Sequence, residues 1–374
     1  MSTEKKKKSG ESWQMHIVKR EMLSRPRAWG IRLAAIAIAL VLCALLIYSI
    51  TKLNPVKVYV SMFKGAFRGS LRTWNTIRDT MVLLCISLGL APAFKMKFWN
   101  IGAEGQVLVG GIATAACMIY LGNQLPLPLL LVVMFVASCL AGAVWGLIPA
   151  LFKAKWNTNE TLFTLMMNYI AIQLTAYFVA LWENPYGSNS VGLINPDTHG
   201  GWFPPLFGMD YLLNVILVLA LTVGMYFYLR NSKQGYEIAV VGDSENTARY
   251  VGMNVKRIIL RTMIISGAIC GLAGCIAVAG TSHTISTEIG GGRGFTAIIV
   301  AWMSKFNAFG MIAYSFLLVF LEKGAMQIAS DFGLNNETSE IMKGIILFVV
   351  LGSEFFLNYK ISFRKISAKE EKNA

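Results

Sequence analysis

Long hydrophobic runs separated by short polar stretches are the dominant pattern of this chain. Most of the runs are long enough, at 1.5 Å of helical rise per residue, to cross the roughly 30 Å hydrocarbon core of a bilayer. The pattern therefore predicts membrane-spanning helices, over residues 33–50, 80–94, 101–121, 127–152, 161–182, 211–229, 262–282, 306–321 and 341–356.

One further run, 295–304, follows the glycine cluster at 290–294. With about ten residues it is too short for a straight span. We expect a broken or re-entrant helix there, packed inside protein, because irregular backbone at membrane depth needs protein partners. The predicted fold class is all-α, a polytopic transmembrane helical bundle of about 8–10 membrane segments with one or two broken or re-entrant helices.

Two shorter patterns predict an interfacial helix and close contacts between helices. Hydrophobic residues recur at helical spacing within the basic segment 52–72, which predicts a short helix lying in the membrane interface. Glycines four residues apart occur at Gly142 and Gly146, and again at Gly267 and Gly271. Such pairs in membrane helices indicate close helix contact.

Charge predicts the orientation and the domain organisation. Residues 1–32 carry nine Lys or Arg, whereas the segment 183–210 carries none. Under the positive-inside rule we expect a basic cytoplasmic tail over 1–32 and a second one over 358–374, flanking a transmembrane domain at 33–357. Within that domain 183–210 is the outer loop, with a proline-rich composition typical of a structured cap, and 230–261 is a long cytoplasmic loop. This predicts a multi-pass membrane protein with both termini in the cytoplasm.

Composition supports this prediction and argues against other classes. The chain is 55% hydrophobic and 14% charged, which is far too apolar for a soluble protein of this size. Its net charge of +14 does not indicate nucleic-acid binding, because the basic residues cluster between hydrophobic runs and form no nucleic-acid motif. All six cysteines lie inside apolar runs, without metal-ligand spacing, and are interpreted as packing residues.

Catalytic motifs are missing from the sequence. It contains no GxxxxGK[ST] phosphate loop, so the chain alone does not bind and hydrolyse ATP in the P-loop manner. Its three histidines, His16, His199 and His283, are scattered without metal-ligand spacing or a partnered nucleophile. We therefore expect no enzyme activity, no metal site and no cofactor bound by this chain.

The polar stretch at the start of the run 101–121 is the first candidate site. Asn100, Glu104 and Gln106 lie there among several glycines, at the mouth of an apolar segment where ionisable groups are costly. In one interpretation these residues brace a bent helix, with Glu104 favoured by the helix dipole. In the other they line or gate a polar substrate path, together with Asn168 of the run 161–182.

The second candidate site lies in the cytoplasmic loop. Asp243 or Ser244 can cap a short helix running to about Tyr250, and Gly252 can end it in a left-handed turn. A capped helix on this side of the membrane suggests a docking element. The alternative is an ordinary solvated loop.

The order of three motifs resembles a known family. Asn-Ile-Gly-Ala-Glu-Gly-Gln at 100–106, Gly-Asp-Ser-Glu-Asn-Thr-Ala-Arg-Tyr-Val-Gly-Met-Asn at 242–254 and Ser-Gly-Ala-Ile-Cys-Gly-Leu-Ala-Gly at 266–274 are similar to permease subunits of bacterial ABC importers. The similarity covers about residues 54–357 and is greatest to the nucleoside and simple-sugar branch of the family that also transports ribose and branched-chain amino acids.

The resemblance implies a transport subunit that works with partners. It implies nucleosides as the solute, with ribose or another simple sugar as the alternative. The partners would be an ATPase that holds ATP and Mg, a homologous or identical second permease, and an extracytoplasmic substrate-binding lipoprotein. It also implies a coupling helix within 236–254, with candidate coupling residues Glu237, Gly242, Asp243, Asn246, Ala248, Arg249, Tyr250 and Gly252.

Some residues depart from the family pattern. Trp99 lies where a smaller or aliphatic residue is common, and Glu322 and Lys323 fall deep in an apolar run. Adjacent residues point about 100° apart on a helix, so Glu322 and Lys323 are not expected to pair with each other. We expect each to face another subunit or to extend its charged end to the membrane surface.

Two other classes remain as alternatives. An ion-coupled secondary transporter could place broken helices at 100–106 and 290–294, in corresponding positions of two halves. Such a carrier has no evident use for a cytoplasmic docking helix. A membrane enzyme is disfavoured because no catalytic constellation is present.

Overall fold

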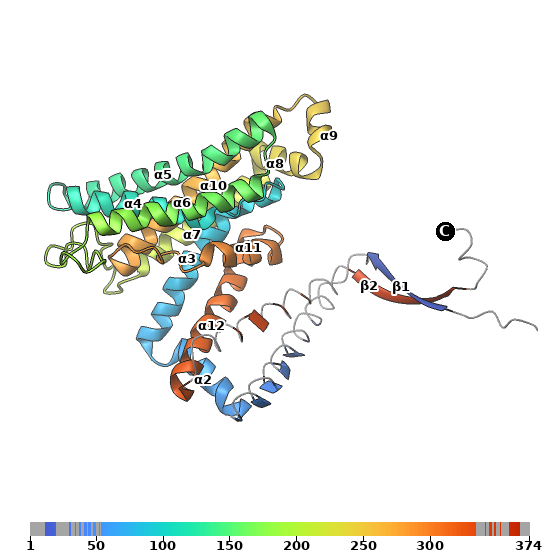
Figure 1. The fold of residues 1–374 in the computed structure, drawn as a ribbon, viewed down its shortest axis with the longest axis horizontal. Helices are drawn as coiled ribbons and strands as arrows, with labels where there is room; N and C mark the ends of the chain where they lie inside the picture. Colours follow the sequence, from blue (N-terminus) through green and yellow to red (C-terminus); the bar gives the residue numbers. More distant parts are fainter. Residues whose placement is uncertain are drawn as a thin grey trace, which may run out of the picture. The chain divides into compact units, whose positions relative to one another are not determined.

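The fold is described from a computed structural model (Figure 1). It describes residues 12–19, 54–333 and 359–366, with scattered positions between 30 and 52 and between 341 and 352. The predicted spans 33–50 and 341–356 therefore lie largely outside the described residues. The chain divides into two units, Lys64–Lys323 and a smaller one made of Met1–Phe63 with Gly324–Ala374.

Long apolar helices build the protein, as the hydrophobic pattern predicts. Seven helices among the described residues are long and apolar enough to span a membrane, which makes this a multi-pass membrane protein. An eighth apolar helix, α11, has only 11 residues, so the predicted broken helix is present. The helices are α3 (Ser70–Lys95), α4 (Ala103–Leu121), α5 (Leu127–Trp156), α6 (Glu160–Leu181), α7 (Leu212–Asn231), α10 (Val255–Ala277, continued by the π-helical turn η1, Val278–Ser282), α11 (Arg293–Met303) and α12 (Ala308–Phe332).

Several helix boundaries differ from the predicted ones. Helix α3 begins at Ser70 rather than at residue 80, and α12 continues to Phe332 rather than to 321. The prediction ended these spans at charged residues, and it was wrong there because the helices contain charges that are paired inside the protein. Asp79 in α3 is only 2% exposed.

Helix α10 is the centre of the larger unit, where it packs on α3, α4 and α5 (Figure 1). The two predicted glycine pairs meet each other at its contact with α5. A Cβ added at Gly142 would overlap the backbone of Gly267 and Gly271, and one added at Gly267 would overlap Gly142. The prediction of close helix contact is confirmed, and larger residues are excluded there.

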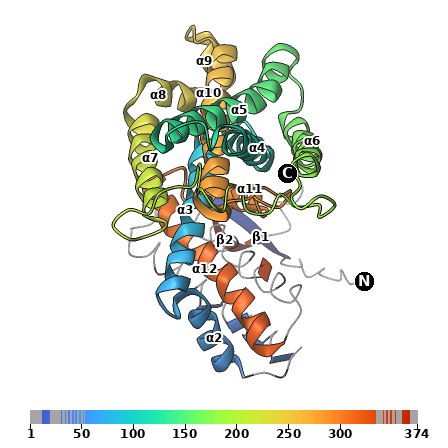
Figure 2. The same cartoon turned by 90° about the vertical axis from the view of Figure 1, so that its left-hand side faces the viewer.

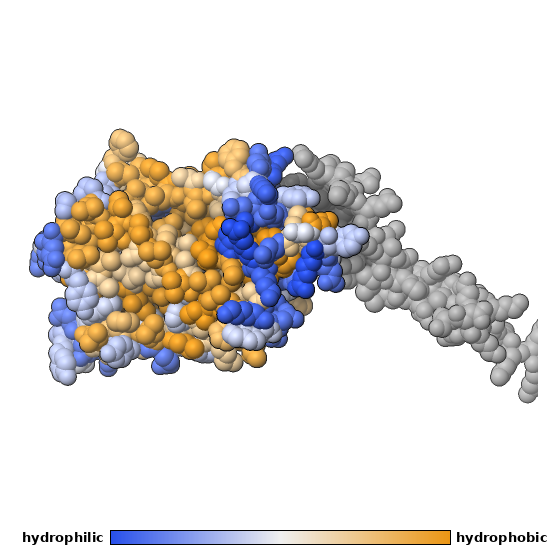
Figure 3. Space-filling view, turned by 90° about the horizontal axis from the view of Figure 1, so that it is seen from above, coloured by the Kyte–Doolittle hydropathy of each residue, from blue (hydrophilic) through white to orange (hydrophobic). Residues whose placement is uncertain are grey.

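The outer surface of the helices is apolar. Along α5 the exposed positions recur every three or four residues, at Val132, Val136, Leu140 and Val144, which is the spacing of one helix face. Figure 3 shows hydrophobic residues over most of the coloured surface on one side of the molecule, with hydrophilic residues in separate patches. Such a surface suits contact with lipid tails.

The predicted outer loop has a defined conformation. The Asn195 side chain donates to the Met118 carbonyl at 2.7 Å, and the Trp202 indole donates to the Ile194 carbonyl at 2.7 Å. The Trp202 ring also stacks on His283, with centroids 3.8 Å apart. These contacts tie the loop to the end of α4 and to the segment that follows η1.

His283 makes this loop sensitive to pH. Burial, assisted by the nearby His199 and Arg78, lowers the pKa of His283 below its usual value, so the folded state disfavours its protonation. The contribution of His283 to the free energy of unfolding should therefore be constant above about pH 6.5, the unperturbed pKa of histidine, and should fall as the pH decreases below it. Thermal unfolding of the purified protein between pH 8 and pH 5 measures this pH dependence of stability. In His283→Asn, which tolerates the left-handed backbone at this position (φ +53°), the contribution of residue 283 to the pH slope should vanish; an unchanged slope would contradict the prediction.

The smaller unit contains the predicted helix within 52–72 and a feature that the sequence analysis missed. Helix α2 (Pro55–Phe67) begins in this unit, and its Ser61 hydroxyl donates to Asp331 at the end of α12. Strands β1 (Ser12–Lys19) and β2 (Tyr359–Ile366) pair antiparallel, with Ser12 opposite Ile366 and Lys19 opposite Tyr359. The two tails were interpreted only as basic segments, although both strands alternate polar and hydrophobic residues, a pattern typical of strands.

Candidate functional site

A buried carboxylate joins the two breaks in the helical pattern. Glu104, in the first turn of α4, accepts a hydrogen bond from the Gly292 amide at 3.0 Å and another from the Gly294 amide at 2.8 Å. Gly292 is the N-cap residue of α11 and Gly294 lies in its first turn, where backbone N–H groups have no partner within the helix. The carboxylate therefore caps α11 and also interacts favourably with its dipole.

Glycine is required where Glu104 of α4 approaches the start of α11. A Cβ at Gly290 would overlap the Glu104 carboxylate, and one at Gly294 would lie 2.6 Å from the Glu104 nitrogen. Gly292 also has a φ of +70°, in the left-handed region that glycine favours. The glycine cluster therefore serves two purposes: it interrupts the helix and lets α4 touch the start of α11.

Asn100 and Gln106 form the next layer of this cluster. The Asn100 amide nitrogen donates to the Gln106 side chain and to the Ser266 hydroxyl, both at 3.3 Å, and its oxygen accepts from the Gly102 amide at 3.1 Å. Asn100 and Gln106 are almost fully buried. Their contacts bind the non-helical segment before α4 to α10.

Asn168 holds the same segment from the side of α6. Its oxygen accepts from the Gly105 amide at 2.8 Å, and its nitrogen donates to the Ile101 carbonyl at 2.9 Å. The hydroxyl of Thr164, one turn earlier, accepts from the Ile101 amide at 3.1 Å. Backbone groups that a helix would have satisfied are thus satisfied by side chains, as irregular backbone in a membrane requires.

The structure brings the four predicted path residues, Asn100, Glu104, Gln106 and Asn168, into one buried cluster. Their polar atoms contact protein partners in this conformation, which is the geometry that bracing of a bent helix requires. Contact with a solute stays a prediction.

A second cluster, of partly buried charged residues around the buried Asp79, was missed by the sequence analysis. Asp79 in α3 contacts Lys323 at 2.5 Å, Arg78 at 3.0 Å and Arg293 at 3.4 Å. Glu322 lies 4.0 Å from Arg293. The cluster links α3, the start of α11 and α12, and it carries one more positive than negative charge.

This cluster corrects the prediction for Glu322 and Lys323. Each of these side chains lies beside an opposite charge of the same chain. Neither therefore requires a partner from another subunit or contact with the membrane surface. A signal was present in the sequence, since charges of both signs near apolar runs indicate internal pairing. The interpretation failed because it left Arg78 and Asp79 outside the span.

Trp99 has a structural explanation. Its ring stacks on Trp302 of α11, with centroids 5.7 Å apart, and the edge of Phe94 packs against both rings. Trp99, the large residue that departs from the family pattern, therefore packs against a second tryptophan. Together they join the segment before α4 to the far end of α11.

The loop predicted to be cytoplasmic contains two helices rather than the predicted one. They are α8 (Lys233–Asp243) and α9 (Glu245–Tyr250), and Figure 2 shows both at one end of the long helices. Ser244, one of the two predicted caps, accepts from the Thr247 amide at 3.2 Å. Gly252 follows in a left-handed conformation with φ +81°, as predicted. The prediction missed α8 and the early start of α10 because it assigned 230–261 to a loop.

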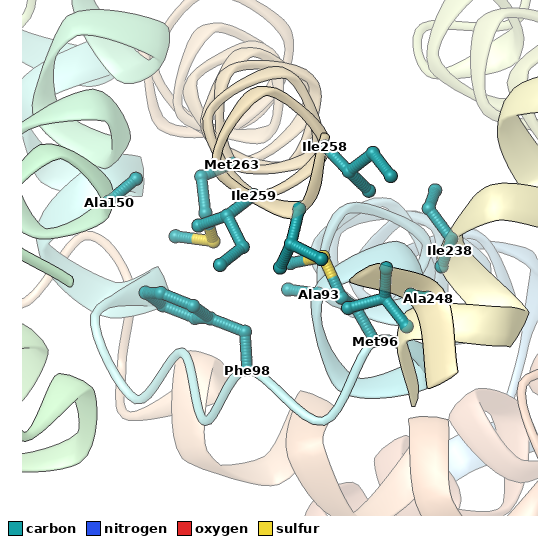
Figure 4. Close-up of a cluster of buried hydrophobic side chains, with 11 residues drawn as sticks. Ala93, Met96, Phe98, Ala150, Ile238, Ala248, Ile258, Ile259 and Met263 are labelled. Atoms are coloured by element: carbon teal, nitrogen blue, oxygen red, sulfur yellow. The ribbon is translucent and has the colours of Figure 1, made fainter. Parts of the chain in front are cut away.

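One face of α8 and α9 is buried against the transmembrane helices. Ile238 and Ala248 belong to a hydrophobic cluster with Met96, Phe98 and Met263 (Figure 4). Gly242 is also buried and lies so close to the Lys95 carbonyl that a Cβ would overlap it. The element is therefore fixed to the bundle instead of forming a free loop.

The remaining predicted coupling residues divide into two groups. Glu237 forms a salt bridge of 2.8 Å with Arg261 in α10, which reinforces the attachment. The others are exposed on α9 and its flanks, and the Tyr250 side chain is 93% accessible. This exposed group comprises Asp243, Asn246, Arg249, Tyr250 and Gly252.

Within the part of the chain that the structure describes, no three His, Cys, Asp or Glu side chains are grouped as a metal site requires.

A bundle of membrane-spanning helices, a short helix capped from a neighbouring span and an external two-helix element define a membrane transport protein. The chain belongs to the family described as "Branched-chain amino acid transport system / permease component", whose model matches residues 72–351.

Relatives with assigned names support the same class. The chain is 31% identical to the guanosine ABC transporter permease protein NupP of Bacillus subtilis, over 79% of this chain and 85% of the relative. It is 27% identical to a glucose ABC transporter permease of Haloferax volcanii, over 82% and 83% of the two chains. It is 25% identical to the nucleoside ABC transporter permease NupB of Lactococcus lactis, over 79% and 84%. All three relatives are named as permease proteins of ABC transporters.

Proposed function

We propose that this chain is the permease subunit of an ABC importer for nucleosides and that a separate ATPase supplies the energy. The observation that carries the proposal is the form of α8 and α9, with one face packed on the bundle and the other face exposed. Arg249 and Tyr250 are exposed on the short capped helix α9, and Asp243 is exposed at the end of α8. A cleft of an ATPase would accept such a projecting element.

A continuous series of contacts connects this element to the broken helix. Ala248 of α9 packs in the cluster that contains Met96 and Phe98, and these residues lead into the segment held by Asn100 and Asn168. Glu104 follows and caps α11. Movement of α9 by the ATPase would therefore shift the segment before α4 and then α11, so the nucleotide state of the ATPase would bias the conformation of the membrane domain.

The solute follows from the relatives. Guanosine and nucleoside permeases match most of this chain, and the guanosine permease has 31% identity. A simple sugar is the second candidate because the glucose permease covers a similar share of both chains. Uptake of labelled guanosine and of labelled glucose by cells with and without this chain distinguishes the two.

The complete importer would need further subunits. The chain would pair with a second permease, identical or homologous, and receive the solute from an extracytoplasmic lipoprotein. ATP and Mg would bind to the ATPase alone. The basic composition of both tails supports a cytoplasmic location for the two termini. The pairing of β1 with β2 agrees with a location of both tails on the same side of the bacterial plasma membrane.

Charge reversal at the exposed surface tests the coupling. Asp243→Lys or Arg249→Glu should reduce solute-stimulated ATP hydrolysis and uptake roughly tenfold or more, since an unfavourable charge contact at an interface costs several kcal/mol. Membrane insertion should be unchanged, because both side chains are exposed. Lys233→Glu, at an exposed position in the first turn of α8, is the control.

Two results would contradict the proposal. Normal coupled uptake in the reversal variants would exclude the assigned docking surface. Uptake driven by an ion gradient through the purified chain, without an ATPase, would instead establish the secondary transporter.

A further inference from the structure

A basic cavity lies at the end of α5, beside the cytoplasmic element. It has a volume of about 210 Å³ and is formed by the last residues of α5, by α9 and by the start of α10. Its lining residues are Lys153, Ala154, Lys155, Asn157, Glu245, Arg249, Val255, Lys256 and Ile259. Four cations and one carboxylate therefore surround one small volume.

Two of the four cations have their charge compensated. Lys153 forms a salt bridge of 2.9 Å with Glu160, and Arg249 forms one of 3.3 Å with Glu245. Lys155 and Lys256 have no ion-pair partner among the described residues, and both are exposed. The cavity thus retains an excess of positive charge that suits an anionic ligand.

The surface beside the cavity is apolar and aromatic. Phe152 contacts Trp156 and Phe163, with ring centroids 5.1 and 4.7 Å apart. Trp156 is 63% exposed and Leu162, at the start of α6, is 54% exposed. Because α5 and α6 are candidate membrane spans, this surface lies at the ends of two apolar helices, and aromatic residues are frequent at the membrane–water interface.

We propose that the cavity binds the phosphate headgroup of an anionic phospholipid, whose acyl chains lie along Phe152 and Trp156. Lys155 and Lys256 are the principal headgroup contacts. A lipid satisfies both halves of the site, the basic cavity and the adjoining apolar surface, whereas an acidic loop of a soluble partner satisfies only the first. Since Arg249 of α9 lines the same cavity, the bound lipid would steady α9 against α5 and α10.

Lipid retention by the full-length purified chain tests the proposal. Native mass spectrometry after addition of phosphatidylglycerol or phosphatidylcholine compares wild type with Lys155→Ala/Lys256→Ala. Retained phosphatidylglycerol should fall roughly tenfold or more in this variant, since each cation near an anionic lipid contributes substantially to binding. Phosphatidylcholine should be retained weakly by both proteins.

The matched control removes the same charge from positions that do not line the cavity. Lys233→Ala/Arg257→Ala changes two exposed cations, of which Arg257 adjoins Lys256 but does not line the cavity. This control should retain phosphatidylglycerol like wild type. Equal retention by all three proteins, or an equal loss in the control, would overturn the proposal. Competition by inorganic phosphate as effective as that by lipid would also overturn it, as would weakened binding of the ATPase with unchanged lipid retention.

Discussion

Glu104→Gln should reduce transport at least tenfold without preventing insertion into the membrane. Glutamine has one acceptor oxygen where the carboxylate has two, and its NH₂ group would face a backbone amide of Gly292 or Gly294. Loss of a charged acceptor from a buried hydrogen bond costs about 1–3 kcal/mol. Uptake by reconstituted importer and thermal unfolding of the purified chain measure the two effects.

Two further variants make the Glu104 prediction specific. Glu104→Asp keeps the charge but shortens the reach, so its effect on uptake should be smaller than that of Glu104→Gln. Glu183→Gln, in the outer loop, removes a partly exposed carboxylate that accepts from the Asn189 amide and should leave uptake near the wild-type rate. Wild-type transport in Glu104→Gln would show that the capping of α11 is dispensable.

Asp79→Asn should destabilise the protein more than any exposed substitution. It leaves the charges of Arg78, Arg293 and Lys323 without their shared carboxylate. Removal of one partner from a buried ion pair costs roughly 3–5 kcal/mol, because the remaining charge is uncompensated. A clear decrease in the thermal unfolding temperature of the purified chain is the expected result.

A second substitution should restore part of the stability lost in the Asp79 variant. Asp79→Asn/Lys323→Met has the same net charge in the cluster as wild type, so its unfolding temperature should lie above that of Asp79→Asn alone. Asp210→Asn, in the outer loop, is the control for loss of an exposed carboxylate. An unchanged unfolding temperature in Asp79→Asn, or the absence of any recovery in the double variant, would contradict the assigned ion cluster.

The sequence was informative where the signal is local. The approximate positions of the seven long helices among the described residues followed from hydrophobic length, and the cap of α9 followed from Ser244 and Gly252. Both kinds of signal depend on residues close together in the chain, whose conformational preferences change little with their surroundings. The same holds for the short α11, since a run of that length cannot form a straight span.

The sequence was misleading where burial changes the meaning of a residue. Charged residues normally end a membrane span, but Asp79 and Lys323 lie inside helices because they compensate each other. The loop assigned to 230–261 likewise contains α8 and the start of α10, whose polar residues pair through Glu237 and Arg261. Patterns along one segment do not reveal a partner supplied by another.

The sequence by itself determined that this chain is a multi-pass helical membrane protein, and its motifs indicated an ABC permease with a capped cytoplasmic helix. Only the tertiary structure decided that Glu104 caps α11, through an amide 188 residues away in the chain, and that Glu322 and Lys323 are paired internally. The physical reason is that hydrophobic length and capping act over a few residues, whereas a buried carboxylate takes whichever donors the path of the folded chain brings to it.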